Sequence, residues 1–226
     1  MRKWFTSLGF AAFIFFASLS VGFSQTAAEI NIKEEVAPSV RLTTHWCFVV
    51  DNSHSMRGVS DKALEGFLEA TRQPTDQLEF AIYAFSDRSM ERFLDWQWAT
   101  EESFAAAATW INTHEHPDIL SYGAVAIREA IKQERDELTV LLITDGGFTE
   151  ASMAGGSWDV IRRAIKEGQD WRARVGLSEA IIVSIGIENP HYRAGNKPSN
   201  EQCQSFLREI GAQYRGGYYY VTGALR

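Results

Sequence analysis

The stretch that decides the fold reads Trp46-Cys47-Phe48-Val49-Val50-Asp51-Asn52-Ser53-His54-Ser55-Met56. Its first half is apolar and contains a β-branched pair, which is typical of a strand buried on both faces of a sheet. The run ends in Asp51, Ser53 and Ser55, whose oxygen-bearing side chains occupy every second position. Alternate residues of an extended chain point the same way, so one carboxylate and two hydroxyls converge on one spot.

This set of oxygen donors favours a hard cation such as Mg²⁺, because it contains neither a thiolate nor an imidazole. The alternative is a strand-to-loop turn in which small polar side chains satisfy backbone groups. The stretch alone does not separate the two. The choice depends on what the rest of the chain places beside Asp51.

Residues 1–24 have the pattern of a secretory signal peptide. Arg2 and Lys3 precede an apolar stretch from about Phe5 to Gly22, and small residues follow it. We expect cleavage after Ser24 and an extracytoplasmic protein, either periplasmic or secreted. The alternative is an uncleaved membrane anchor, since the apolar stretch is just long enough to span a bilayer.

Residues 25–40 lack a clear hydrophobic period, which indicates an N-terminal arm or linker. Residues 41–226 are long enough for one domain with a complete core. The formal net charge of the chain is −7, and loss of the two basic residues of the signal would make it −9. Such acidity argues against nucleic acid, and against strong binding to an anionic membrane after cleavage.

Beyond the arm, apolar runs alternate with helical patterns. Strands are predicted at 42–50, 78–85, 138–144, 180–187 and 218–221, with a short, more polar edge strand at 90–96. Helices are predicted at 60–73, 100–111, from 121 onward, at 157–173, and after a capping box at 199–202.

This alternation predicts an α/β fold. We expect a doubly wound, mainly parallel six-stranded sheet with helices on both faces and one short antiparallel edge strand. Ligands of such sheets bind beyond the carboxyl ends of the strands. Asp51 and Asp145 both follow apolar strands and fall at that edge, which favours the metal interpretation over the turn.

In this order, the motifs resemble the von Willebrand factor A (VWA) domain family, including its metal-ion-dependent adhesion site. Residues 51–55 are similar to the family's Asp-x-Ser-x-Ser, and Ile143-Thr144-Asp145-Gly146 resembles its Thr-Asp-Gly signature. Weaker similarities lie at 81–86, 185–187 and 210–219. The resemblance implies a Mg²⁺ ion ligated directly by the Ser53 and Ser55 hydroxyls, with Asp51 and Asp145 acting largely through water.

In the family a third loop normally adds a threonine hydroxyl, and this chain places Ser121 there. The family's usual Gly-Gly-Thr is missing, because Ile119 and Leu120 precede a serine. Ser121 could instead be a plain helix N-cap, and Asp118 is a nearby competitor that would add negative charge. The expected metal ligands are Asp51, Ser53, Ser55, Ser121 and Asp145, with Mg²⁺ as the ion and Mn²⁺ or Ca²⁺ as alternatives.

Two carboxylates and neutral hydroxyls only just neutralise a divalent ion and leave coordination positions to water. An incoming carboxylate oxygen can replace such a water. We therefore expect a non-enzymatic, Mg²⁺-dependent binding module that captures an Asp or Glu side chain of another protein. The alternatives are a metal-assisted hydrolase and a structural subunit with an unused site. The sequence contains no nucleophile elbow, zinc-protease motif or phosphate loop that would support an enzyme.

Two further sets of residues have simple interpretations. His54, His114 and His116 could bind a transition metal together, but solvated loop histidines are the favoured interpretation. Cys47 and Cys203 are the only cysteines, and the expected topology separates them by several strands. We predict two free, buried thiols rather than a disulfide.

In the VWA family a helix follows the closing strand and packs on the sheet. Here residues 222–226 stand where that helix would begin. A parallel sheet needs both faces covered, so we expect the arm or a partner subunit to shield the face. We also expect integrin-like regulation by a shift of that helix to be absent.

Overall fold

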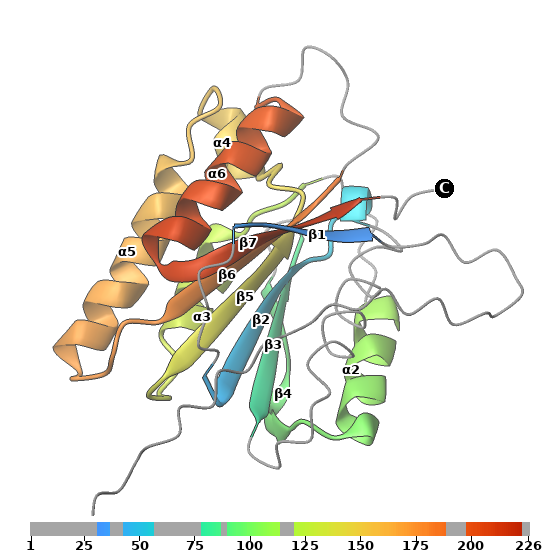
Figure 1. The fold of residues 1–226 in the computed structure, drawn as a ribbon, viewed down its shortest axis with the longest axis vertical. Coiled ribbons are helices and arrows are strands. Elements are labelled where there is room, and N and C mark those ends of the chain that lie inside the picture. The colour runs from blue at the N-terminus through green and yellow to red at the C-terminus, as the bar shows by residue number, and fades with distance from the viewer. Residues whose placement is uncertain are drawn as a thin grey trace, which may run out of the picture.

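The computed structural model describes residues 31–36, 43–56, 78–86, 90–113, 120–188 and 198–222. In this part of the chain a twisted sheet has helices on both sides (Figure 1). The strands are β1 (Asn31–Val36), β2 (His45–Asp51), β3 (Glu79–Phe85), β4 (Met90–Trp98), β5 (Leu138–Thr144), β6 (Ile181–Ile187) and β7 (Arg215–Thr222). The helices are the 3₁₀ turn η1 (His54–Met56), α2 (Glu101–Thr113), α3 (Ala124–Ile131), α4 (Thr149–Met153), α5 (Asp159–Arg174) and α6 (Asn200–Gln213).

The strand order is β1-β7-β6-β5-β2-β3-β4. The five strands β7, β6, β5, β2 and β3 run parallel, whereas β1 and β4 pair antiparallel at the two edges. The doubly wound α/β fold, with β4 as an antiparallel edge strand, is confirmed. The described sheet has seven strands rather than the six expected.

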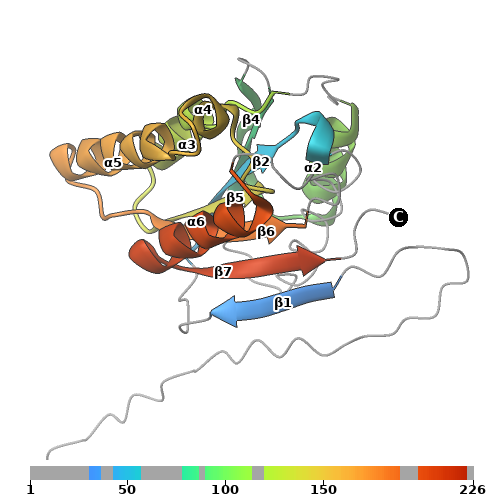
Figure 2. The same cartoon turned by 90° about the horizontal axis from the view of Figure 1, so that it is seen from above.

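The additional strand, β1, comes from the segment expected to be an arm. It pairs with β7 along the edge of the sheet, as Figure 2 shows from above. Its pairing shifts register between Glu34 and Val36. Its charged sequence, Asn-Ile-Lys-Glu-Glu-Val, lacks the apolar alternation that would have indicated a strand. The described part of the arm thus covers the edge of β7 and not a face of the sheet. Residues 25–30 and 37–40 lie outside the described residues.

Two hydrophobic cores lie on opposite faces of the sheet. In β2, Cys47 and Val49 join the core beneath α3, α5 and α6, while Phe48 and Val50 join the core on the side of α2. Residues 46–50 are all buried, which explains why this stretch is apolar without interruption. Cys47 and Cys203 are free and buried, as predicted, and burial raises the pKa of the Cys47 thiol.

Of the remaining predictions for single helices, one is confirmed, one helix was missed, and one lies outside the described residues. The capping box at Ser199 is present, with Ser199 accepting from Gln202 N and the Gln202 side chain accepting from Ser199 N. The five-residue helix α4 was not predicted. The expected helix at 60–73 and the signal sequence lie outside the described residues. None of the described helices is long and apolar enough to cross a membrane.

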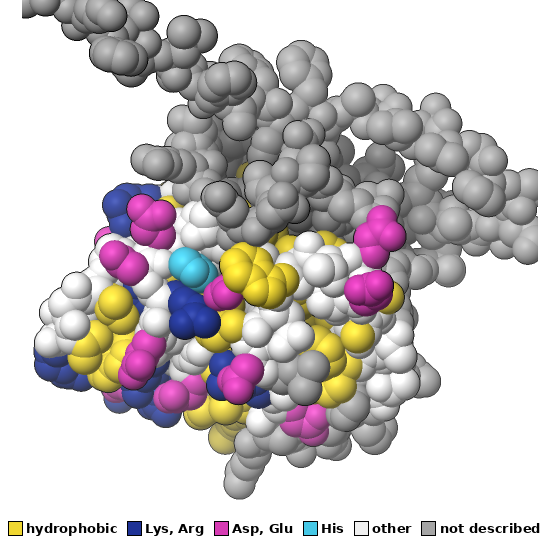
Figure 3. Space-filling model, turned by 90° about the horizontal axis from the view of Figure 1, so that it is seen from below, with side chains coloured by type: hydrophobic (Ala, Val, Ile, Leu, Met, Phe, Trp, Pro, Cys, Tyr) yellow, Lys and Arg dark blue, Asp and Glu magenta, His cyan; other side chains and the backbone are white. Residues whose placement is uncertain are grey.

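Figure 3 shows the edge of the sheet at which the parallel strands begin, where acidic and basic side chains are interspersed with apolar ones. Arg135 is paired there with Glu79 at 3.3 Å, and its guanidinium stacks over Trp96 at 5.2 Å. Oppositely charged side chains thus lie next to one another on this edge. The carboxylates Asp51 and Asp145 lie at the other edge, where the parallel strands end.

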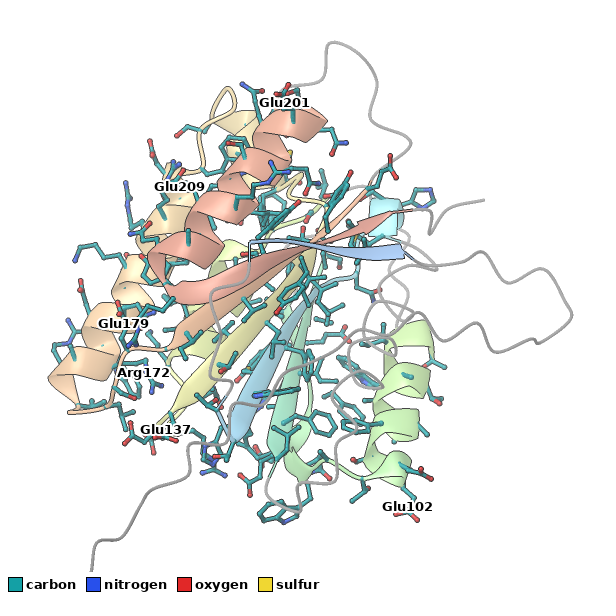
Figure 4. The ribbon with its side chains drawn as sticks, viewed as in Figure 1. Glu102, Glu137, Arg172, Glu179, Glu201 and Glu209 are labelled. Atoms are coloured by element: carbon teal, nitrogen blue, oxygen red, sulfur yellow. The ribbon has the colours of Figure 1, made fainter. Side chains whose placement is uncertain are left out.

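Arg172 joins the connections at the N-terminal ends of β5 and β6. It belongs to α5, is fully buried, and is labelled in Figure 4. Its guanidinium donates to the carbonyls of Ser178 (2.6 Å), Ile131 (3.3 Å), Gln133 (2.9 Å) and Arg135 (2.8 Å). Ile131 ends α3, where a cation also complements the negative end of the helix dipole. One side chain therefore fixes how α3 leads into β5 and how α5 leads into β6.

We predict that Arg172→Lys lowers the free energy of unfolding by about 2–4 kcal/mol. A single ammonium cannot reach carbonyls on both connections, so some would be left buried and unpaired. Urea unfolding would measure the change, with Arg163→Lys on the exposed side of α5 as the control. Similar unfolding energies for the two variants would contradict the role given to Arg172.

Candidate functional site

Two buried carboxylates meet at the edge where the parallel strands end. Asp51 closes β2 and Asp145 directly follows β5, and these strands are adjacent with Val50 paired to Ile143. Asp51 is 0% exposed and Asp145 is 2% exposed. Asp51 is the last residue of a buried strand and Asp145 directly follows another, so the sheet fixes their positions closely.

The Asp51 carboxylate is the centre of a hydrogen-bond network. Its Oδ1 accepts from the backbone N–H of Ser53 at 3.0 Å. Its Oδ2 accepts from the hydroxyls of Ser121 at 2.9 Å and Thr144 at 2.8 Å. The hydroxyls of Ser53 and Ser55 lie 3.1 Å apart and share a hydrogen bond. The structure thus brings Ser53 and Ser121 onto Asp51, with Ser55 beside Ser53.

Asp145 occupies a tight turn after β5. Its Oδ1 accepts from Gly147 N at 2.7 Å, and Gly146 N donates to Thr144 Oγ1 at 3.0 Å. Gly146 has a φ of 81°, a left-handed conformation that glycine adopts without strain. A Cβ at this position would also lie 2.9 Å from the Cβ of Cys203 in α6. This turn therefore requires glycine at position 146.

Ser121 is not the N-cap of a helix, so that alternative is wrong. Helix α3 begins at Ala124, its N-cap is Gly123, and no side chain of its own caps it. The hydroxyl of Ser121 is directed at Asp51 instead, 70 residues away in the sequence. Asp118, the competing candidate, lies outside the described residues.

Two polar residues of this edge were not predicted as members of the site. Thr144 donates to Asp51, and the signal for it was a polar residue directly after the apolar run of residues 140–143. Ser86 follows Phe85, the residue of β3 paired with Asp51, and its carbonyl accepts from Tyr122 N at 2.7 Å. The Ser86 hydroxyl is buried and has no hydrogen-bond partner in the described part of the chain.

Electrostatics make the ionised pair unfavourable without a cation. Burial, and next the charge of Asp145, raise the pKa of Asp51 to about 7. Hydrogen bonds from Ser53 and Thr144 oppose that rise. Buried carboxylates that repel one another are stabilised by protonation or by a bound cation.

The donors fit a hard cation. Within the described ranges no group of three or more His, Cys, Asp and Glu side chains gathers to hold a metal. The donors here are two carboxylates and several hydroxyls, all of them oxygen, which suits Mg²⁺ better than zinc or copper. His54 is exposed, and His114 and His116 lie outside the described residues.

Comparison with known proteins gives only distant likenesses. No protein-family model matches the chain, and no curated protein matches it. Solved structures with a similar course of the chain include the conserved hypothetical protein BatB from Bacteroides thetaiotaomicron, at 17% identity and a TM-score of 0.46 over 78% of this chain and 89% of that one. Another is an aerotolerance-related membrane protein from Bacteroides fragilis, at 12% identity and a TM-score of 0.47 over 80% of this chain and 92% of that one.

A third is a mutant of the PilB minor pilin from Streptococcus sanguinis, at 11% identity and a TM-score of 0.48 over 80% of this chain and 57% of that one. Likenesses at this level carry no argument about function. We therefore infer the function from the residues at the ends of β2 and β5.

We predict that the metal-free protein becomes more stable as the pH falls. The folded-state pKa of Asp51, about 7, exceeds its ordinary value of 3.8, so the folded state binds the proton more tightly. The stabilisation develops as the pH falls through the folded pKa and levels off below the unfolded one. Between the folded-state and unfolded-state pKa values of Asp51, the free energy of unfolding rises by up to about 1.4 kcal/mol for each pH unit that the pH falls.

Urea unfolding in chelator, from about pH 8 to about pH 5.5, measures this dependence. The neutral amide of Asp51→Asn should remove most of it while the other groups continue to titrate. Equal slopes for the wild type and the variant would show that Asp51 is ionised throughout this range.

Proposed function

We propose that this chain is an exported, Mg²⁺-dependent protein-binding module of the VWA type. Its ion is held by Asp51, Ser53, Ser55, Ser121 and Asp145, and it binds an Asp or Glu side chain of a partner protein. The observation that carries the proposal is the pair of buried carboxylates, Asp51 and Asp145, at the ends of adjacent parallel strands. They lie where ligands of such sheets bind.

The arrangement of donors around Asp51 supports a preformed site. Hydroxyls from two separate segments, Ser121 and Thr144, already donate to this carboxylate and hold it in one orientation. A ligand set that needs no rearrangement binds its ion at little cost in conformational entropy. Each serine hydroxyl keeps oxygen lone pairs with which to coordinate a cation.

The chemistry that a bound Mg²⁺ would supply is a local positive charge with exchangeable water positions. On a chain with a formal net charge of −7, such a centre would attract a carboxylate that the rest of the surface repels. We infer binding rather than catalysis from the state of Asp51. Its carboxylate is buried and accepts hydrogen bonds from Ser53, Ser121 and Thr144, so it is poorly placed to take a proton from a substrate.

We predict that Mg²⁺ raises the melting temperature and that Asp51→Ala abolishes the gain. An ion that binds only the native state stabilises it by about 2.7 kcal/mol at a hundredfold excess over its dissociation constant. The control is Asp95→Ala on β4, because that carboxylate is 88% exposed and pairs only at the surface with Arg92. Thermal melts of the three proteins with Mg²⁺ and with chelator make the comparison.

If the wild type melts at the same temperature in Mg²⁺ and in chelator, the site does not bind Mg²⁺ at the concentrations used. A gain that persists in Asp51→Ala would place the ion elsewhere on the molecule.

We predict that a carboxylate ligand displaces water from the loaded site. The probe is Mn²⁺ in place of Mg²⁺, since its effect on water-proton relaxation reports exchangeable water on the ion. Addition of a short peptide containing Asp should lower the relaxation enhancement, whereas the same peptide with Asn should leave it unchanged. Equal responses to the two peptides would rule out carboxylate capture.

A further inference from the structure

The strongest feature outside the ligand set is the contact between α4 and the segment that carries Ser121. Figure 2 shows α4 next to α3, and Ala124, the first residue of α3, donates a hydrogen bond to α4. Ser121 N donates to Thr149 Oγ1 at 2.7 Å, and Thr149 N donates to the Ser121 carbonyl at 2.7 Å. Both backbone groups of Ser121 are therefore bound by one residue of α4.

Glu150, the next residue of α4, caps a helix to which it does not belong. Helix α3 has no side-chain cap of its own, although the first N–H groups of a helix need acceptors. Glu150 Oε1 accepts from Ala124 N at 3.1 Å. Burial raises the pKa of Glu150, and hydrogen bonds from the N–H groups of Ala124 and Gly123 oppose part of that rise.

The same segment is also packed against an aromatic pair. A Cβ on Gly123 would lie 2.4 Å from the Phe148 ring, and that ring stacks on Phe85 at a centroid distance of 5.9 Å. The segment that carries Ser121 is thus packed against a ring at Gly123 and hydrogen-bonded to α4 at Ser121 and Ala124. Little freedom is left for the backbone that carries the Ser121 hydroxyl.

Glu150 is not an efficient stabiliser of the fold. Its second oxygen, Oε2, is buried and has no hydrogen-bond partner among the described residues. A buried acceptor without a partner costs free energy, so an apolar residue would suit general packing at least as well. What Glu150 adds is a fixed position for the beginning of α3, directly after Ser121.

We propose that Glu150 is a positioning residue for the Ser121 ligand, and that it acts together with Thr149. The two residues hold residues 121–124 where the Ser121 hydroxyl reaches Asp51. The positioning follows from the contacts alone, whereas its consequence for metal affinity rests on the proposed function. Residues that orient a metal ligand in this way typically change metal affinity by tenfold or more when they are removed.

Hydrogen exchange tests the positioning without any metal. In chelator, the amides of Ser121 and Ala124 should be protected in the wild type. Protection of Ala124 should fall at least about tenfold in Glu150→Ala, which removes its acceptor. Glu150→Gln keeps a carbonyl oxygen at the same place and should retain the protection. Unchanged protection of Ala124 in Glu150→Ala would overturn the inference, whether or not the protein binds Mg²⁺.

Mg²⁺ titration by calorimetry tests the consequence. Glu150→Ala should weaken Mg²⁺ binding about tenfold, and Glu150→Gln should restore most of it. In a Ser121→Ala background the Glu150 substitution should have almost no further effect, because its action passes through Ser121. A general loss of stability would instead give independent effects, and that result would overturn the positioning role.

Thr149→Val supplies a second variant, since it removes only the acceptor for Ser121 N and nearly conserves volume. It should loosen Ser121 in hydrogen exchange and leave Ala124 protected. If the wild type does not bind Mg²⁺ but the hydrogen-exchange results are as expected, the proposed function is refuted and the positioning role of Glu150 and Thr149 stands. Normal protection of Ser121 in Thr149→Val would contradict the role given to Thr149.

Discussion

The buried carboxylate of Asp51 is the constraint on which the functional edge of the molecule depends. Ionised and out of contact with water, it is stable only where donors or a cation surround it. Ser53 N and the hydroxyls of Ser121 and Thr144 meet that need from three segments far apart in the chain. Asp145 works against it by placing a second negative charge nearby. The hydroxyl network and the two carboxylates together form a site suited to a hard divalent ion.

The sheet makes this convergence reproducible. Strands β2 and β5 are paired over six consecutive positions and buried on both faces, so the loops at their ends cannot shift independently. At the other end of the parallel strands, where they begin, Arg172 joins the connections that enter β5 and β6. Beside the site, α4 holds the beginning of α3. Rigid strands therefore place the carboxylates, whereas a short helix places the Ser121 hydroxyl.

The fold could be predicted from the sequence to the extent that its strands are long, apolar and buried. The carboxylates could be predicted as well, because each directly follows such a strand. Strand β1 escaped prediction because it is charged and pairs with a strand almost two hundred residues later. The sequence favours Ser121 as a ligand over a cap only slightly, since only the third dimension shows that α3 begins after it. Glu150 gave no signal, because it caps a helix 26 residues earlier in the chain.

The measurement that tests the metal site most directly is anomalous diffraction from crystals grown with Mn²⁺. We predict one anomalous peak at the ends of β2 and β5, within direct bonding distance of the Ser53 and Ser55 hydroxyls and close to both carboxylates. The peak should vanish in Asp51→Asn crystals grown in the same way. Wild-type crystals that diffract well and show no peak between Asp51 and Asp145, or show it only elsewhere on the molecule, would contradict the claim that these residues form a metal site.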